Sequence, residues 1–219
     1  MFNEFKGYYS NGKTIVVQIP PTLLISSLAV IDYPENMVSL DFKNSGDLIY
    51  LLGETFNEMG GSEYYRFLCD KKTNNNIGSI VPEVNSKINI LLYKTFYRAV
   101  TRKIFSSSIS VGRGGLGIAL AKSAIGGMLG IKISLKNISK KLNSDDELLF
   151  SESQVRILVS ISPYNKKKFE KIFNKLKYYH IGTVTSGNKI EIKGINNKTI
   201  IKCNINNLLK SYLKTFKDY

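Results

Sequence analysis

The sequence contains no tryptophan, one histidine and two cysteines among its 219 residues. Cys69 and Cys203 lie far apart, so their spacing predicts neither a zinc site nor a disulfide framework. His180 has no cysteine or carboxylate beside it in the sequence to orient it, so we expect a structural or surface role. The scarcity of cysteine favours a reducing, cytoplasmic setting.

The sequence also lacks a run of about eighteen apolar residues, which argues against a membrane-spanning helix. Residues 1–6 lack the apolar core of a secretory signal. A hydrophobic content of 43% is nevertheless enough to form the core of one domain, or of one domain with an appendage.

Acidic residues are few relative to basic ones, and the formal net charge is +14. Clustered Lys and Arg would indicate nucleic-acid binding. Here the lysines are dispersed among Asn and Ile, and no aromatic–basic RNA motif or paired-cysteine finger is present. We therefore expect attraction to phosphorylated ligands or to an acidic partner subunit, and no specific nucleic-acid partner.

Short β segments are predicted over the first 43 residues. Asn11-Gly12 is a hairpin signal that precedes an alternating strand over residues 14–19, and Pro20-Pro21 interrupts the pattern. Residues 23–31 are apolar and partly β-branched, which predicts a second strand.

Strands and helices follow one another through the rest of the chain. Apolar and β-branched runs predict strands over residues 47–52, 105–111, 131–135, 155–161, 180–185 and 189–192. Helical spacing predicts helices over residues 86–103, 116–128, 164–176 and 205–216. Residues 70–76 are expected to form an exposed loop, and residues 148–150 to begin one. This order indicates an α+β fold with a mixed sheet and helices packed on it.

The helix predicted over residues 86–103 has an apolar face and a basic stripe. Its apolar face consists of Ile88, Leu91, Leu92, Thr95, Phe96, Ala99 and Val100. Lys94, Arg98 and Arg102 recur every four residues, which is most simply a solvated helix face.

Glycines, carboxylates and hydroxyl residues crowd into a few turns. Residues 51–65 (LLGETFNEMGGSEYY) follow a buried strand, and they are followed by residues 81–85 (VPEVN), 112–121 (GRGGLGIALA) and 145–154 (DDELLFSESQ). In this order and spacing they resemble the synthetase subunit of phosphoribosylformylglycinamidine synthase, most specifically at residues 51–65 and 150–154. The resemblance extends over nearly the whole chain but only over the last quarter to third of such a subunit.

The resemblance implies a division of the chain and an activity. Residues 1–43 would be the tail of a preceding N-terminal-type domain, and residues 44–219 a C-terminal domain like that of aminoimidazole ribonucleotide synthetase. The family is an ATP-dependent ligase of purine biosynthesis, which converts formylglycinamide ribonucleotide and glutamine-derived ammonia to the amidine. The whole enzyme uses ATP and Mg²⁺, whereas this chain alone is expected to be inactive and need hold no cofactor.

The family resemblance also implies partners. These are the remaining synthetase domains, a glutaminase subunit, a small accessory subunit, and a homo-oligomer or pseudo-dimer formed through the sheet. Neither cysteine lies in a glycine-flanked nucleophile elbow, so glutamine hydrolysis is expected to belong to the glutaminase.

The turn from Gly112 to Gly115 is the best candidate for a phosphate cradle. Free backbone N–H groups at a helix N-terminus attract anions, and Arg113 would add a forked cation. A tight turn that lets the helix pack closely is the structural alternative. Related enzymes often carry a His-Asp pair before the glycines, where this sequence has Ile109 and Ser110. The family's synthetase subunit has two similar halves, of which only one is catalytic. The absence of the His-Asp pair suggests that this chain comes from the second, non-catalytic half.

Two other groups complete the candidate binding residues. Gly60, Gly61, Ser62 and Glu63 form one, and Ser151 and Glu152 form the other, near Arg156, which could pair with Glu152. Glu54, Glu58 and Glu63 could hold Mg²⁺, but a role in capping loop N–H groups is the simpler interpretation. We assign no catalytic residue and no metal ligand within this chain.

These observations leave open hypotheses of different classes. The first is an enzyme part, the C-terminal region of the synthetase. The second is a non-catalytic assembly module of the same complex, and another member of the superfamily, such as an aminoimidazole ribonucleotide or selenophosphate synthetase, is a third. A stand-alone nucleic-acid-binding protein is the remote alternative.

Overall fold

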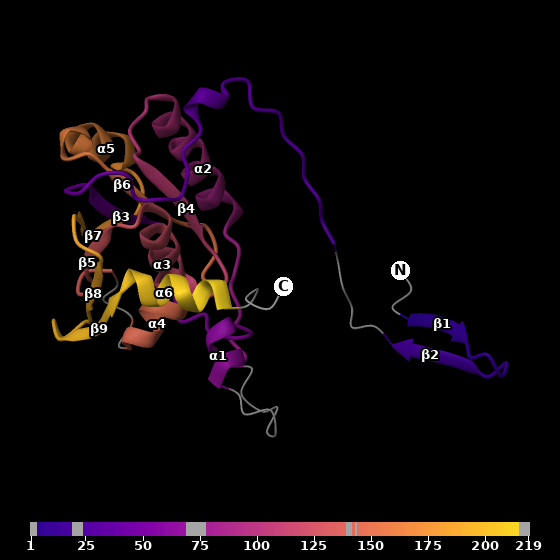
Figure 1. The fold of residues 1–219 in the computed structure, drawn as a ribbon. Coiled ribbons are helices and arrows are strands. Elements are labelled where there is room, and N and C mark those ends of the chain that lie inside the picture. The colour runs from indigo at the N-terminus through magenta and orange to yellow at the C-terminus, as the bar shows by residue number, and fades with distance from the viewer. Residues whose placement is uncertain (1–3, 19–23, 69–77, 139–141, 143, 215–219) are drawn as a thin grey trace. The chain divides into compact units, whose positions relative to one another are not determined.

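The computed structural model describes residues 4–18, 24–68, 78–138, 142 and 144–214 (Figure 1). The chain divides into two compact units, Met1–Pro34 and Glu35–Tyr219. The predicted loop over residues 70–76 lies outside the described residues, as do Pro20-Pro21 and Cys69.

The first unit contains an antiparallel hairpin of β1 (Glu4–Tyr8) and β2 (Thr14–Gln18). Its turn follows the Asn11-Gly12 prediction, because Gly12 has a φ of +80° that a side chain would disfavour. The strand predicted over residues 23–31 is wrong for the described residues 24–31, which pair with no strand. Apolar sequence alone does not make a strand where no neighbour supplies the backbone hydrogen bonds.

The second unit is built on a seven-stranded mixed sheet with the order β4-β6-β3-β7-β5-β8-β9. All neighbouring pairs are antiparallel except β5 and β8, which are parallel. The strands are β3 (Leu48–Leu52), β4 (Ser107–Val111), β5 (Gly130–Ser134), β6 (Arg156–Ile161), β7 (Tyr178–Thr185), β8 (Lys189–Lys193) and β9 (Thr199–Asn204).

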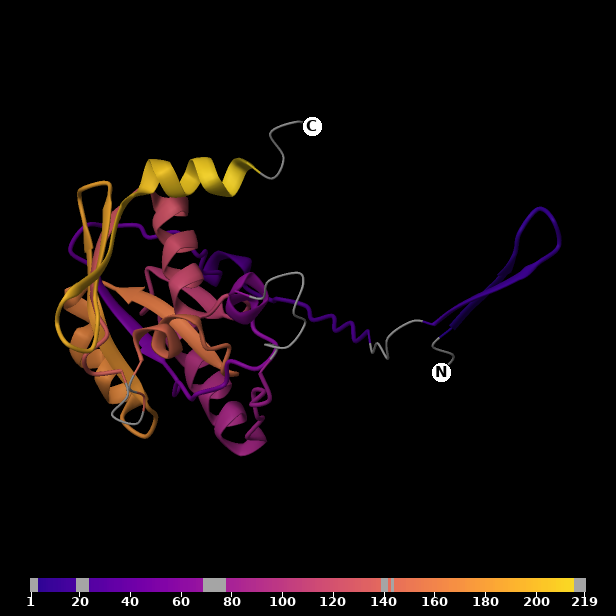
Figure 2. The same ribbon diagram turned by 90° about the horizontal axis from the view of Figure 1, so that it is seen from below.

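Helices cover both faces of this sheet. The helices are α1 (Glu63–Leu68), α2 (Ser86–Thr101), α3 (Gly115–Gly127), α4 (Asp145–Phe150), α5 (Lys166–Phe173) and α6 (Ile205–Leu213). Short 3₁₀ turns occupy Pro34–Asn36 and Pro163–Asn165. Figure 2 shows α3 and α6 on one side of the sheet and α2 and α5 on the other.

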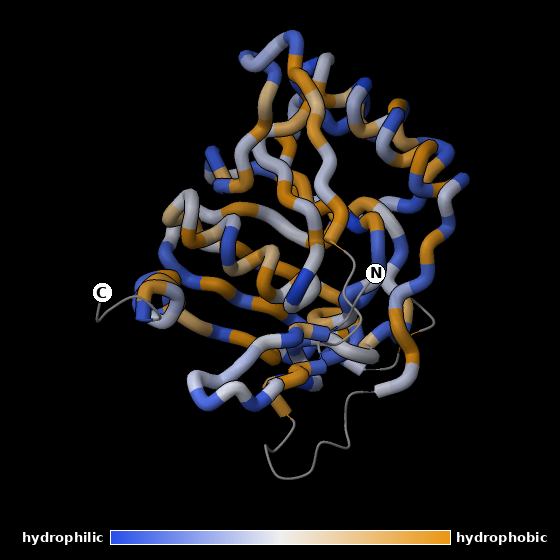
Figure 3. Tube along the Cα trace, turned by 90° about the vertical axis from the view of Figure 1, so that its right-hand side faces the viewer, coloured by the Kyte–Doolittle hydropathy of each residue, from blue (hydrophilic) through white to orange (hydrophobic). Residues whose placement is uncertain are grey.

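Each face of the sheet has its own hydrophobic core. Along the interior strand β3, Ile49 and Leu51 belong to the core under α3 and α6, and Tyr50 and Leu52 to the core under α2 and α5. This alternation is the period of two that a strand imposes on its side chains. Figure 3 shows apolar residues along the strands, with apolar and polar residues interspersed along the helices. The predicted α+β class with a mixed sheet is confirmed.

Three elements differ from the sequence-based expectations. The loop expected from residue 148 is wrong, because residues 145–150 form α4, which Ser144 caps by accepting a hydrogen bond from the Asp146 amide. Leu148 and Leu149 are buried by this helix. Strand β9 and the short helix α1 were not predicted, and Asn204 is the residue that caps α6.

Helix α2 follows its prediction but ends two residues earlier, and only part of its apolar face is buried. Leu92, Thr95 and Ala99 are buried, whereas Ile88 and Leu91 are 54% and 46% exposed. None of the helices in the described part of the chain has the length and apolar composition that crossing a bilayer requires.

Candidate functional site

The predicted glycine- and carboxylate-bearing turns around residues 60, 113 and 152 gather at one end of the sheet. Leu52, the last residue of β3, pairs with Ile157 of β6, and Val111, the last residue of β4, pairs with Arg156. The antiparallel register therefore brings the turns after β3 and β4 next to the segment that precedes β6.

The carboxylate of Glu152 joins two of these turns. Its Oε1 atom accepts a hydrogen bond from the Glu63 amide at 2.9 Å and another from the Gly114 amide at 2.8 Å. Gly114 is the N-cap of α3, so the negative charge lies where the helix dipole favours an anion. The N–H group that the sequence assigns to a phosphate is thus held here by a carboxylate of the same chain.

The Gly112–Gly115 turn needs glycine at its end for steric reasons. Gly115 has a φ of +68°, and an added Cβ would lie 2.5 Å from the Leu149 carbonyl oxygen and 2.7 Å from that of Ser151. Gly112, in contrast, has no atom within 4 Å of an added Cβ. The turn therefore packs closely on the backbone of residues 149–151, as the structural alternative requires.

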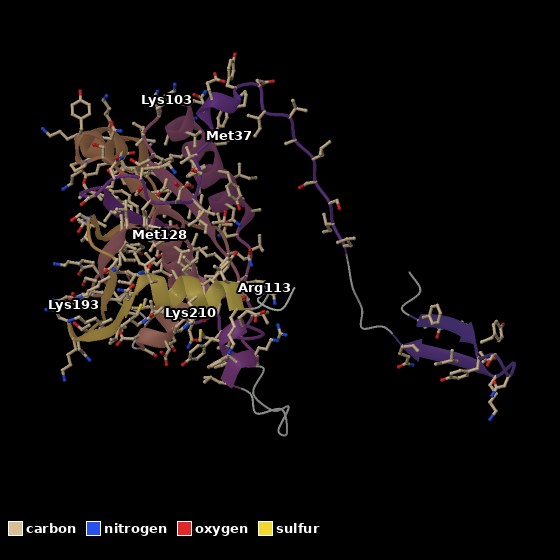
Figure 4. All side chains as sticks on the ribbon, in the orientation of Figure 1. Met37, Lys103, Arg113, Met128, Lys193 and Lys210 are labelled. Carbon is tan, nitrogen blue, oxygen red and sulfur yellow. The ribbon has the colours of Figure 1, made fainter. Side chains whose placement is uncertain are left out.

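Arg113 forms an ion pair with Glu63 (Arg113 is labelled in Figure 4). The Arg113 guanidinium lowers the pKa of the Glu63 carboxyl below its ordinary value of 4.5, and Arg66, 3.4 Å away, adds to the effect. The Arg113 side chain is 76% exposed, so the pair lies in solvent. The cation expected to bind phosphate is thereby neutralised by α1.

Gly60, Gly61 and Ser62 shape the turn that leads into α1. An added Cβ at Gly60 would lie 2.6 Å from the Ile80 carbonyl oxygen, and the Gly60 amide donates to the same oxygen at 2.7 Å. Gly61 has a φ of +68°. The buried Ser62 hydroxyl accepts from the Tyr65 amide at 3.3 Å, so it caps α1.

Ser151 is fully buried and fastens the residue-56 turn to the segment before β6. Its hydroxyl donates to the Phe56 carbonyl oxygen at 2.7 Å, and the neighbouring Ser153 hydroxyl accepts from the Phe56 amide at 3.0 Å. These hydrogen bonds fix the backbone on both sides of Glu152.

Arg156 is the residue whose importance sequence reasoning missed. Its side chain is 1% exposed, and its guanidinium donates to Thr55 Oγ1 at 3.1 Å, to the Ser153 carbonyl oxygen at 3.2 Å and to that of Ser151. Burial lowers the pKa of Arg156 to about 10, against the opposing influence of the Glu58 and Glu152 charges. The sequence feature that could have identified Arg156 is its position as a charged residue at the start of an apolar strand.

The suggested pairing of Arg156 with Glu152 is wrong as a direct contact, because no ion pair joins them. The guanidinium instead donates hydrogen bonds to oxygen atoms of the turns, whereas the Glu152 carboxylate accepts hydrogen bonds from backbone amides. The two charges stabilise the same turns by separate sets of hydrogen bonds.

The three glutamates considered for Mg²⁺ do not meet. Glu58 is 7% exposed, and its Oε1 atom accepts from the Glu83 amide at 3.0 Å, whereas Glu63 pairs with Arg113. In the part of the chain that the structure describes, no three His, Cys, Asp or Glu side chains gather as metal ligands.

The remaining chemistry-bearing residues lie apart from the turns. Ile109 and Ser110 lie within β4, and His180 lies in β7 with its ring 5.0 Å from that of Tyr50. Cys203 lies in β9, where burial raises the pKa of its thiol and so reduces its reactivity.

Comparison with known proteins gives a family match. The family model described as "AIR synthase related protein, C-terminal domain" matches residues 44–195. The phosphoribosylformylglycinamidine synthase subunit PurL of Methanocaldococcus jannaschii is 32% identical over 200 residues, which cover 90% of this chain and 26% of that protein. The chain thus spans about a quarter of the length of the curated relatives it matches.

Solved structures of Thermotoga maritima PurL share the fold. The structure complexed with FGAR aligns with a TM-score of 0.67 at 20% identity, covering 80% of this chain and 30% of that one. The structure complexed with ATP gives 0.61 at 18% identity, covering 89% and 28%. PurLQS gives 0.63 at 18% identity, covering 89% and 29%.

Proposed function

Because the chain belongs to the AIR synthase related family through that family's C-terminal domain, we propose that it supplies this domain to an ATP-dependent carbon–nitrogen ligase of purine biosynthesis. The reaction converts formylglycinamide ribonucleotide and glutamine-derived ammonia to the amidine. The 32% identity to a PurL subunit over 200 residues carries the proposal. Since those residues are 26% of that relative, catalysis requires further synthetase domains, and this chain alone is inactive.

We assign the two parts of the chain to different domains of such a synthetase. Residues 44–219 form the C-terminal domain, and residues 1–43 are the tail of a preceding N-terminal-type domain. The exposed apolar residues of the hairpin support this assignment, because Tyr8, Phe5 and Val16 are 79%, 58% and 49% exposed. A two-stranded ribbon cannot bury such residues by itself, so they require a neighbouring domain.

We propose that the bridged turns face the nucleotide side of the assembled enzyme. ATP would supply the phosphoryl group that activates the amide oxygen, with Mg²⁺ held mainly by other domains. Gly112–Gly115, Gly60–Glu63 and Glu152 are the groups of this chain that could meet it, whereas the buried Ser151 would support them from below. A phosphate would have to displace Glu152 from the Gly114 amide and Glu63 from Arg113, since both positions are taken by carboxylates.

A non-catalytic assembly module of the same complex is the second candidate. The hydrogen bonds just described favour it. The Gly114 amide and the Arg113 guanidinium, which would bind a phosphate, are already paired with Glu152 and Glu63 of the same chain. The turns would then serve to hold one rigid surface against the neighbouring domain. The PurLQS structure of Thermotoga maritima supports association with other subunits, which we propose to be a glutaminase and a small accessory subunit in the cytoplasm.

Reconstitution tests the enzyme proposal. The chain is mixed with Methanocaldococcus jannaschii PurL from which the matching region has been deleted, and ADP release is measured with formylglycinamide ribonucleotide and ammonia. We expect substrate-dependent ADP release from the mixture and from neither part alone. Rescue of the deleted synthetase by its own missing piece, but not by this chain, would contradict the proposal.

Calorimetry separates the ligand-site role from the assembly role. ATP with Mg²⁺ is titrated into the isolated chain and into its Glu152→Gln variant. Binding that is tighter in the variant favours a nucleotide site on these turns, because the phosphate no longer has to displace the Glu152 charge, whereas equal binding in both samples places the site elsewhere. The absence of binding heat in both samples, together with successful reconstitution, favours the assembly role.

A further inference from the structure

A groove of about 700 Å³ runs between α2 and α5 and is lined by cations. Arg98 comes from α2 and Arg102 caps its C-terminus, and Lys168, Lys171 and Lys175 come from α5 and the residues that follow it. All five side chains are exposed, and among the described residues no carboxylate forms an ion pair with any of them. Such a concentration of unpaired charge raises the local potential and attracts anions.

The floor of this groove is apolar. It consists of Leu91, Ile104, Ile172 and Leu176, with Leu91 46% exposed. A purely solvated charged face needs no such floor, because apolar surface left in water costs free energy in proportion to its area. The combination of a cationic rim and an apolar floor indicates a partner that is both acidic and apolar.

A second hollow of about 310 Å³ continues the groove toward the start of α2. The two share Leu91, Lys175 and Leu176, so they form one continuous depression. Phe56, Ile88 and Val155 also line this second hollow, and Ile88 is 54% exposed although it belongs to the helix's predicted apolar face. The depression is therefore apolar at one end and basic at the other.

The length of the depression suits a helix. It follows α2 from Asn85 to Arg102. At 1.5 Å of rise per residue, this span is about 25 Å, or between four and five helical turns. Helix-in-groove recognition uses apolar anchors at every third or fourth residue and charged residues on the flanks.

We propose that the α2–α5 depression is a docking surface for an amphipathic helix of a partner protein, with acidic residues concentrated in one half. The acidic half lies over Arg98, Arg102 and Lys171, and the apolar anchors lie over Ile88 and Leu91. Charge complementarity decides the occupant, because no carboxylate lines the basic end, whereas at the apolar end Glu54 and Glu83 stand beside Lys175 and Lys177 and leave no excess of positive charge.

Nucleic acid fits the same surface less well. No aromatic ring lines the basic end itself, where single-stranded nucleic acid would need one for base stacking; the Tyr164 ring lies beside it, 5.3 Å from Lys168 Nζ. The basic lining does not continue to the other end, where Glu54 and Glu83 stand beside Lys175 and Lys177, so a continuous row of phosphates would find no matching row of cations. A duplex would leave the apolar floor without a complementary surface.

Fluorescence anisotropy with the full chain tests the proposal. The probe is a labelled helical peptide of about 17 residues, with leucines at every third or fourth position and glutamates confined to one half. One comparison peptide replaces the leucines by glutamine at unchanged charge, and a single-stranded oligonucleotide of equal charge is measured alongside. We expect saturable binding of the amphipathic peptide and at least about tenfold weaker binding of both comparison probes.

Charge reversals with a matched control locate the site. Arg98→Glu with Lys171→Glu removes two groove cations, whereas Lys122→Glu with Lys167→Glu makes the same change in net charge at exposed lysines outside it. We expect Kd to rise at least about tenfold for the groove pair and less than about twofold for the control pair. Thermal melts of both variants verify that each remains folded.

Three results would overturn the proposal. Equal weakening by both pairs would mean that the peptide senses net charge alone. Equal affinity for the glutamine-substituted peptide would remove the role of the apolar floor. Tighter binding of the oligonucleotide, lost in the groove pair, would identify the surface as a nucleic-acid site.

Discussion

The Glu152 carboxylate oxygen Oε1 lies 2.8 Å from the amide nitrogen of Gly114, the residue that caps helix α3. The same oxygen accepts from the amide of Glu63, so one side chain ties together turns that lie 38 and 89 positions away in sequence. Glu152 therefore links the turn before α1 to the N-terminus of α3, beside the hydrogen bonds that Ser151, Ser153 and Arg156 make to the neighbouring turn.

Removing this carboxylate should destabilise the domain. Glu152→Ala leaves the Gly114 and Glu63 amides without their acceptor, at a cost of about 1–3 kcal/mol in the free energy of unfolding. Urea denaturation measures the loss. Glu147→Ala on neighbouring α4 is the control, because no described residue donates to its side chain, and it should change stability by less than about 0.5 kcal/mol. Equal effects of the two substitutions would refute the bridging role.

A methyl group at Gly115 should be far more costly than one at Gly112. Gly115→Ala places a carbon 2.5 Å from the Leu149 carbonyl oxygen in a residue with a φ of +68°, which we expect to cost about 2–4 kcal/mol. Gly112→Ala has open space around the added carbon and should be nearly neutral. Thermal unfolding of both variants checks the difference, and a tolerated Gly115→Ala would show that the close packing is wrong.

Arg156 should be among the least replaceable residues of the second unit. Arg156→Met removes the donors to Thr55, Ser153 and Ser151 and should cost about 3 kcal/mol or more. Arg156→Lys keeps the charge but cannot reproduce the forked donor geometry of the guanidinium, so it should recover only part of the lost stability. Arg66→Ala, at a side chain that is 75% exposed, is the control and should be nearly neutral by urea denaturation.

The Arg113–Glu63 pair should be visible in a pH titration. Because Arg113 lowers the folded-state pKa of Glu63, the pair contributes stability above the ordinary pKa of 4.5, and this contribution is lost as the pH falls through the lower folded value. In Arg113→Gln the pKa of Glu63 should rise toward its ordinary value, as measured by NMR of the side-chain carboxyl. The lowered pKa of Asp41, which Lys43 maintains, should not change.

The sequence was sufficient for the elements whose signals are local. The β-branched run of β6, the apolar run of β3 and the proline before α5 each specify their own structure, and the α+β class follows from their order. Residues 24–31 show the limit of this logic. They have the composition of a strand, but a strand exists only with a partner, and composition does not reveal one.

The candidate site was predictable in its parts but not in its connections. The glycine turns stood out because several stretches with small and acidic residues follow one another in a particular order and spacing. That Glu152 occupies the Gly114 amide, and that Arg156 bonds oxygens instead of Glu152, depends on the register between strands remote in the chain. Periodicity does not encode such register, so the partner of each charge could not be derived before the structure.

The position of β3 in the interior of the sheet has a consequence for how the protein forms. Its two neighbours, β6 and β7, begin at Arg156 and Tyr178, each more than about a hundred residues further along the chain. The middle of the sheet therefore cannot close until most of the polypeptide has left the ribosome. Until then the apolar sequence Leu48–Leu52 has no native neighbour, so it is an unpaired strand of the kind that is prone to aggregation during folding.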